Sequence, residues 1–115
     1  LDNLYITAME MENVRELLGN NPINVSSGYR SLELNTLLGS KPTSAHTRGL
    51  ACDFTCPKYG DPHDIVDAIF RSDILYDQII LEFDKWVHIA FPADGESARK
   101  KALIINKKGT MIYSQ

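Results

Sequence analysis

The sequence predicts an α+β fold with about three helices and a mainly antiparallel sheet. Apolar residues recur at helical spacing in parts of the chain, and elsewhere short apolar or alternating runs lie between turn residues, which is typical of strands. At 115 residues the chain is long enough for one hydrophobic core and too short for two. We therefore expect a single domain that spans residues 1–115.

The first two helices are expected from apolar spacing, a capping serine and glycine stops. One is expected at about residues 7–18, where apolar residues recur at helical spacing and Gly19 follows. The other is expected at residues 31–38, with Ser31 as a cap and Gly39 at its end. The apolar residues at this spacing in the first helix are Met11, Val14, Leu17 and Leu18.

The third helix begins with a strong capping pattern. Asp61 can act as the N-cap residue, Pro62 suits the first helical position, and Asp64 places a negative charge in the first turn. This helix is expected to turn its apolar residues toward the core, namely Ile65, Val66, Ile69 and Phe70.

The strands are expected where short apolar or alternating runs are bounded by turn residues. The last two flank Asn106 and Gly109 and form a hairpin. Residues 40–48 are rich in turn-forming residues and are expected to form a loop that leads into a strand. The expected strands cover residues 23–25, 50–55, 76–82, 86–91, 102–105 and 110–113.

The composition is that of an ordinary soluble globular protein, with 43% hydrophobic and 23% charged residues. The net charge is −3 and acidic and basic residues are mixed, so we expect no nucleic-acid partner. No apolar run approaches the roughly 20 residues of a membrane span, and the first residues lead us to expect no signal peptide. We expect a monomer without a membrane partner.

Two histidines and one aspartate form a candidate metal site. His46 and Asp53 lie in a loop and in the strand that follows it, and His88 closes a later strand-like run. Two imidazoles and one carboxylate make a three-ligand zinc set with a fourth coordination position open, as in catalytic zinc sites. Gly49 and Ala51 are expected on the strand face of Asp53, where their small size lets the backbone pass close to a metal.

Glu82 is the candidate proton acceptor for a water molecule that such a metal activates. If residues 83–85 form a three-residue loop, Glu82 pairs with Trp86 and shares one face of the hairpin with His88. A two-residue loop would break this register and turn Glu82 away. Asp84 tolerates the left-handed conformation that such a loop often demands, so the first option is allowed.

Other polar residues have weaker or structural interpretations. Arg30 stands at a helix entrance, where a guanidinium could bind a substrate carboxylate or stabilise an oxyanion. His63, in the first turn of a helix, is expected to be structural. Cys52 and Cys56 would lie about 13 Å apart in an extended segment, beyond the roughly 7 Å limit for a disulfide. We therefore expect no disulfide between them and a buried thiol at Cys52.

These motifs resemble those of the zinc D-Ala-D-Ala carboxypeptidase family. That family shares its fold with bacteriophage L-alanyl-D-glutamate endolysins, vancomycin-resistance dipeptidases and the hedgehog signalling domain. The resemblance rests on Ser-Gly-Tyr-Arg-Ser at residues 27–31, on the pattern S-x-H-x-x-G-x-A-x-D at residues 44–53, and on Trp-Val-His at residues 86–88. It is strongest for the small phage and prophage members, and it implies a hedgehog/DD-peptidase-like fold.

The resemblance implies a ligand set and a role for one arginine. Zn²⁺ would be bound by His46, Asp53 and His88. Arg30 stands in the position of the family arginine that steadies the substrate or the transition state.

The base and the substrate contacts are also implied by the resemblance. Several members place the catalytic acid three residues before the last histidine, where this chain has Lys85. Glu82, six residues before it, matches the hedgehog-like branch instead, and Asp84 is the alternative base. Trp86 would line the substrate pocket, and Ser44 would contact the substrate or orient the first histidine.

The implied activity is that of a zinc metallopeptidase that hydrolyses peptide bonds in peptidoglycan stem peptides, as a D-Ala-D-Ala carboxypeptidase or an endopeptidase. Such a hydrolase would act in lysis or remodelling of the bacterial cell wall, in the periplasm or delivered by a phage. The alternative is a non-catalytic zinc-containing module that binds peptidoglycan or a protein, because the hedgehog-like branch keeps zinc ligands without established peptidase work. A structural zinc site is a third option, and it predicts a fourth ligand such as His63 or a cysteine.

Overall fold

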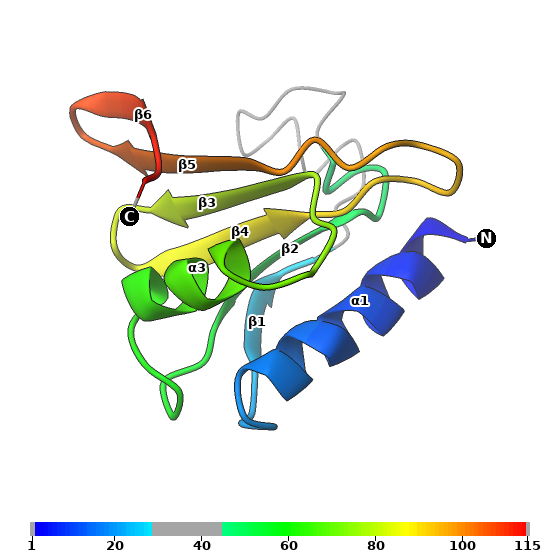
Figure 1. The fold of residues 1–115 in the computed structure, drawn as a ribbon, viewed down its shortest axis with the longest axis horizontal. Helices are drawn as coiled ribbons and strands as arrows, with labels where there is room; N and C mark the ends of the chain where they lie inside the picture. Colours follow the sequence, from blue (N-terminus) through cyan, green and yellow to red (C-terminus); the bar gives the residue numbers. More distant parts are fainter. Residues whose placement is uncertain (1, 29–44, 115) are drawn as a thin grey trace.

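The computed structural model describes residues 2–28 and 45–114, in which the chain forms two helices and one six-stranded sheet (Figure 1). This is the α+β architecture expected from the sequence. The helices are α1 (Asn3–Leu17) and α3 (Pro62–Phe70). The strands are β1 (Asn24–Ser27), β2 (Ala51–Thr55), β3 (Gln78–Glu82), β4 (Trp86–Ala90), β5 (Lys101–Asn106) and β6 (Gly109–Ile112).

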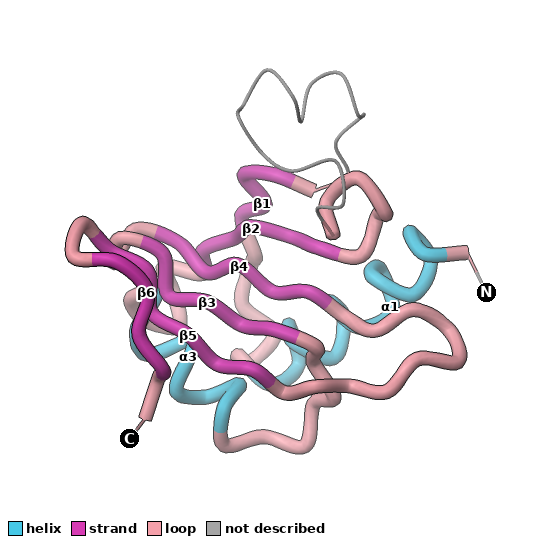
Figure 2. Tube along the Cα trace, turned by 90° about the horizontal axis from the view of Figure 1, so that it is seen from above, coloured by secondary structure: helices cyan, strands magenta, loops and turns pink. Residues whose placement is uncertain are grey.

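The strand order is β1-β2-β4-β3-β5-β6. Neighbouring strands are antiparallel except for β3 and β5, which run parallel, so the sheet is mainly antiparallel as predicted. The central strand β4 pairs with β2 on one side and with β3 on the other (Figure 2). These three strands carry most of the candidate site residues.

Both helices cover the same face of the sheet and build the hydrophobic core with it (Figure 1). α3 packs on β3 and β4 and also contacts α1. The strands contribute alternate residues to this core, as the pleat of a sheet requires. The core residues with no exposed surface include Val14, Leu18, Phe54, Ile65, Val66, Ile69, Ile79, Val87 and Ile89.

The opposite face of the sheet carries the polar candidates. Alternation along β2, β3 and β4 puts Asp53, Glu82, Trp86 and His88 on the face away from the helices. All of them are partly exposed, whereas their neighbours along the strands are buried in the core or close to it. We call this the open face of the sheet.

α1 begins earlier than the predicted residues 7–18. Asp2 is its N-cap residue, and the carboxylate accepts hydrogen bonds from the backbone N–H groups of Leu4 and Tyr5. The apolar spacing starts well after this cap, so the spacing alone placed the start of the helix too late. Leu17, although it follows the apolar spacing, lines an open groove and is 36% exposed.

α3 has the predicted start. The Asp61 carboxylate accepts a hydrogen bond from the backbone N–H of Asp64, and the Asp64 carboxylate accepts one from the backbone N–H of Asp61. Pro62 occupies the first helical position. Neither α1 nor α3 has the length and apolar character that crossing a membrane requires. The helix expected at residues 31–38 lies outside the described residues.

β1 covers Asn24–Ser27 instead of the predicted residues 23–25, because its extent is set by pairing with β2 and by an irregularity in that pairing between Val25 and Ser27. Cys52 is buried, as expected; Cys56 is buried as well, and both thiols are free.

Candidate metal centre

His46, Asp53 and His88, which we call the metal set, converge from three segments. Asp53 on β2 and His88 on β4 are direct partners in the antiparallel register, so their side chains leave the sheet side by side. His46 approaches from the turn that precedes β2. One potential ligand atom from each residue lies within 4.8 Å of the other two. Within residues 2–28 and 45–114, no further His, Cys, Asp or Glu joins this group.

The Gly28 carbonyl orients the His46 ring. The Nδ1 atom of His46 lies 2.7 Å from this oxygen. Since a carbonyl only accepts hydrogen bonds, Nδ1 is the donor to Gly28, and Nε2 is the ring nitrogen that faces Asp53. Metal-binding histidines are usually oriented by such a second hydrogen bond. Sequence reasoning missed this role of Gly28, because a backbone carbonyl leaves no mark in the residue type.

The donor atoms of the metal set converge on one carboxylate oxygen. The Nε2 atom of His46 and the Nδ1 atom of His88 lie 3.2 and 2.9 Å from the same Oδ1 atom of Asp53. Both ring nitrogens therefore face the same carboxylate oxygen. Two imidazole nitrogens and one carboxylate oxygen form a donor set that suits zinc.

Asp53 is ionised at neutral pH. Burial raises the pKa of its carboxyl, but hydrogen bonds with His46 and His88, together with their charge, outweigh burial and lower the pKa to about 2. His46 is buried, whereas the side chains of His88 and Asp53 keep 12% and 16% of their surface exposed. The metal set is therefore accessible from the open face of the sheet.

α1 holds the turn that carries His46. The Thr7 hydroxyl donates a 2.6 Å hydrogen bond to the carbonyl of Gly49, and the Asn3 amide donates a 2.8 Å hydrogen bond to the carbonyl of Arg48. These contacts join positions that are 42 and 45 residues apart. Sequence reasoning missed both residues, because no local pattern marks a contact over such a distance.

Gly49 lies in the turn before β2, and the prediction that it lies on the strand face of Asp53 was wrong. Its φ angle is +73°, in the left-handed region that favours glycine. A Cβ atom at this position would also lie 3.1 Å from the Cδ2 atom of Leu4 on α1. The small residue is thus required by backbone conformation and by close packing against the helix.

Glu82 and Trp86 are direct partners across the β3–β4 hairpin, which confirms the predicted three-residue loop. The backbone N–H of Lys85 donates a 3.0 Å hydrogen bond to the carbonyl of Glu82, which closes the loop. Phe83 and Asp84 take positive φ angles of 54° and 56°. Glu82 and Trp86 therefore share the open face with His88, while Asp84 lies in the turn.

The remaining candidates do not join the metal set. Arg30 and Ser44 lie outside the described residues. His63 packs against the Tyr113 ring, with 5.8 Å between the ring centroids. Cys52 points into the core, where burial and then a nearby negative charge raise the pKa of its thiol to about 12. In the described part of the chain, a closed structural zinc site thus gains no fourth ligand from a histidine or a cysteine.

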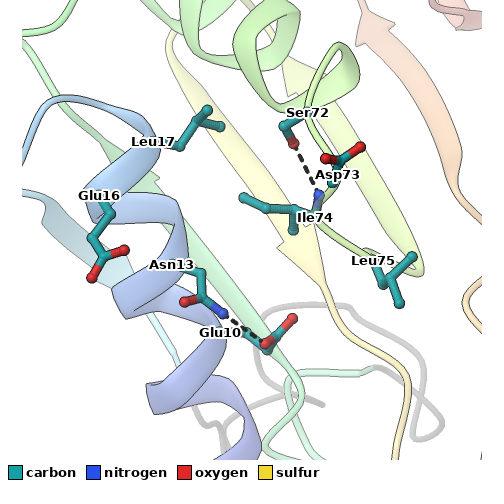
Figure 3. A pocket seen from close by; sticks show the side chains of 8 residues that line it. All are labelled: Glu10, Asn13, Glu16, Leu17, Ser72, Asp73, Ile74 and Leu75. Atoms are coloured by element: carbon teal, nitrogen blue, oxygen red, sulfur yellow. Dashed lines mark hydrogen bonds between the residues drawn. The ribbon is translucent and has the colours of Figure 1, made fainter.

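A separate groove of about 590 Å³ opens between α1 and the loop after α3 (Figure 3). Several of its polar groups bond to each other: Asn13 donates to the Glu10 carboxylate, and the backbone N–H of Ile74 donates to the Ser72 hydroxyl. No side chain of the metal set lines this groove. It therefore has no part in the metal centre.

Residues 3–90 match the protein family described as Peptidase M15. The chain belongs to this family. The matched range begins at the first residue of α1, ends at the last residue of β4 and contains the whole metal set. Peptidase M15 members are zinc-dependent peptidases, so membership in the family implies that the chain is a hydrolase. The metal set of two histidines and one aspartate is consistent with this membership. The resemblance to the zinc D-Ala-D-Ala carboxypeptidases is thereby confirmed. No curated protein sequence matches the chain.

Proposed function

We propose that this peptidase M15 member is a zinc metallopeptidase that hydrolyses peptide bonds in peptidoglycan stem peptides, as a D-Ala-D-Ala carboxypeptidase or an endopeptidase. The observation that carries the proposal is the metal set, whose three ligand atoms lie within 4.8 Å of one another on the open face of the sheet. Three protein ligands with an accessible fourth position are the pattern of catalytic zinc. In this role the chain acts in lysis or remodelling of the bacterial cell wall.

Each member of the metal set has an assigned ligand atom. His46 through Nε2, Asp53 through Oδ1 and His88 through Nδ1 would hold Zn²⁺. When bound there, Zn²⁺ supplies polarisation of the scissile carbonyl and activation of the attacking water. The protein would contribute geometry, because the Gly28 carbonyl orients the ring of His46 and Asp53 and His88 are partners in the β2–β4 register.

Glu82 is the proposed proton carrier. Its register partner is Trp86, two positions from His88 on β4, so Glu82 and His88 are diagonal neighbours, which lie roughly 7–8 Å apart. The Glu82 carboxylate takes a proton from the attacking water and later returns it to the leaving amine. Asp84 is the second candidate, but its backbone lies in the turn, beyond the strand face that carries His88.

Arg30, Ser44 and Trp86 are the proposed substrate contacts. Trp86 shares the open face with the metal set and is the direct partner of Glu82. The Arg30 guanidinium would bind a substrate carboxylate or the oxyanion that develops at the scissile carbonyl. Ser44 would contact the substrate or orient His46.

The experiment is digestion of defined muropeptides by the zinc-loaded protein, with the products identified by mass. Release of a single D-amino acid marks a carboxypeptidase, and internal fragments mark an endopeptidase. Glu82→Gln keeps the shape of the side chain but removes the base, so it should retain zinc and lower kcat by about 10²–10⁴-fold. Glu16→Gln, on the exposed side of α1, is the matched control and should keep wild-type activity.

Three outcomes would change the proposal. Full activity of Glu82→Gln would remove that residue as proton carrier and direct attention to Asp84→Asn. Absence of zinc from the purified, zinc-treated protein would refute the mechanism. Binding of zinc and stem peptide without any released product would identify the chain as a non-catalytic zinc-containing module that binds peptidoglycan or a protein.

A further inference from the structure

A cavity of about 500 Å³ lies where two neighbouring hairpins turn. The parallel pairing of β3 and β5 brings the β3–β4 turn and the β5–β6 turn to the same end of the sheet (Figure 1). The backbone N–H of Phe83 donates a 2.8 Å hydrogen bond to the carbonyl of Ile105, which joins the two hairpins. We call this cavity the hairpin-end pocket. It is lined by Phe83, Asp84, Lys85, Trp86, Asn106 and Lys107.

The hairpin-end pocket lies beyond the metal set along β4. Trp86 and His88 occupy alternate positions of this strand and share the open face. Two residues of an extended chain span roughly 6.6 Å. A peptide bound in an extended conformation has the same rise per residue as the strand. If its scissile bond lies at the metal set and it runs along β4, a residue about two positions away reaches Trp86.

The indole N–H of Trp86 lacks a hydrogen-bond acceptor among the described residues. Its Nε1 atom is buried. A buried donor without a partner destabilises the protein, because it has lost its hydrogen bonds to water. An indole N–H only donates, so a ligand that satisfies it must bring an oxygen that accepts.

The aromatic rings and the charged side chains that line the pocket indicate which class of ligand it can bind. Phe83 is 42% exposed, and its ring lies 5.9 Å from the ring of Trp86. Among the lining residues, Lys85 and Lys107 bring two positive charges against one negative charge from Asp84. The Glu82 carboxylate stands next to Trp86 outside this lining. Aromatic surface combined with the positive charge of the lining and a buried N–H donor without a partner suits an aliphatic group that ends in a carboxylate.

We propose that the hairpin-end pocket binds a substrate residue that carries a free carboxylate, about two positions from the scissile bond. The inference rests on the proposed function, because it takes the substrate to be a peptide bound across the metal set. The Trp86 N–H and the Lys107 ammonium bind the carboxylate, and the rings of Trp86 and Phe83 pack on the aliphatic part. A stem peptide supplies such a group where an acidic residue is linked through its side chain and keeps its α-carboxylate free.

The test uses Trp86 as its own reporter, because it is the only tryptophan of the chain. The probe is a stem tetrapeptide whose γ-linked D-glutamyl residue has a free α-carboxylate, and the comparison peptide has that carboxylate amidated. Both are titrated into metal-free and zinc-loaded protein while the fluorescence is recorded. We expect a saturable change and about 10-fold tighter binding of the carboxylate peptide, the size of effect typical of a charge-assisted hydrogen bond.

Two neighbouring lysines provide a matched pair of variants. Lys107→Gln should remove most of the preference for the carboxylate peptide. Lys108→Gln changes the next residue, which is exposed and does not line the pocket, and should keep the preference. Trp86→Phe keeps an aromatic ring but lacks the N–H donor, and calorimetry should show weaker binding of both peptides.

Failure of the pocket and failure of the peptidase give different results. Equal affinity for both peptides, or equal effects of Lys107→Gln and Lys108→Gln, would overturn the pocket even if the protein cleaves peptides. Carboxylate selectivity in a chain that binds no zinc and releases no product would support the pocket and refute the peptidase.

Discussion

Asp53 and His88 are direct partners in the β2–β4 register, and the Oδ1 atom of Asp53 lies 2.9 Å from the Nδ1 atom of His88. Two of the three proposed ligands are thus positioned by the backbone hydrogen bonds of the central strands. The third, His46, depends on a turn that α1 holds from outside the sheet. Asp53 and His88 therefore lie on rigid strands, whereas the position of His46 depends on contacts between segments far apart in the sequence.

Zinc should stabilise the chain only while the metal set is intact. A ligand that binds the folded state alone stabilises it by about 4 kcal/mol when its free concentration is 1,000-fold above Kd. We expect zinc to raise the Tm of the wild-type protein and a chelator to reverse this shift. Asp53→Asn and His88→Asn should show no shift when their thermal unfolding is measured with and without zinc.

His63→Asn is the control for the zinc-dependent shift, because His63 packs against Tyr113 and not on the metal set. It should keep the full shift. A shift that disappears in His63→Asn but persists in His88→Asn would mean that the ligands have been misassigned.

Thr7→Val should weaken zinc binding although Thr7 is not a ligand. The substitution keeps the shape but removes the hydroxyl that donates to the Gly49 carbonyl. Loss of an outer hydrogen bond around a metal site typically costs 10–100-fold in affinity, and we expect about 10-fold here. Chelator competition measures the zinc Kd, and thermal unfolding without zinc measures the structural cost.

Thr7→Ser separates the two roles of this residue, because it restores the hydroxyl. Its zinc Kd should return to the wild-type value. If Thr7→Val lowers the Tm but leaves the zinc Kd unchanged, α1 supports the fold alone and does not position the turn that carries His46.

Gly49→Ala should cost more stability than Gly95→Ala. Both glycines have left-handed φ angles, +73° and +84°, where a Cβ atom costs about 1–2 kcal/mol. A Cβ at Gly49 would also meet Leu4 at 3.1 Å, whereas nothing lies within 4 Å of one at Gly95. Urea unfolding should show the larger loss for Gly49→Ala, and adding Leu4→Ala should recover the difference. Equal losses in the two single variants would exclude the contact with Leu4.

The residue types of the metal set and the β3–β4 register could be predicted because local sequence carries both. Histidine and aspartate are the residue types that zinc chemistry requires, and their positions at a strand entrance and along a strand leave few alternatives. The three residues between Glu82 and Trp86 determine which side chains share a face. The start of α3 was equally local, because Asp61 and Asp64 cap each other within one turn.

What escaped prediction depends on contacts between distant segments. The link from Thr7 to Gly49 crosses 42 positions and leaves no pattern along the chain. The exposure of Leu17 depends on the loop that faces it across a groove, which apolar spacing within α1 does not describe. A glycine can be required by close packing or by a left-handed backbone conformation, and the sequence does not tell these apart. At Gly49 the positive φ angle shows that the backbone conformation requires it.

The stability of the fold should fall at low pH partly through Asp77. Its carboxylate accepts hydrogen bonds of 2.9 and 2.7 Å from the Nε and Nη2 atoms of Arg99, which lies shortly before β5. These hydrogen bonds lower the pKa of Asp77. A lowered pKa in the folded state means that the ionised form stabilises the fold. The contribution is complete above the ordinary carboxyl pKa of about 3.9 and is lost as the pH falls through the lower folded-state value.

Asp77→Asn should therefore lower the free energy of unfolding at neutral pH by about 1 kcal/mol, since Arg99 is 57% exposed and solvent weakens the pair. It should also lose less stability than the wild-type protein between about pH 5 and about pH 2, because the titrating group is gone. Urea unfolding across this range measures both effects. Arg99→Gln should flatten the pH dependence in the same way, and the double variant should lose no more than either single one. Fully additive losses would show that the two side chains do not interact.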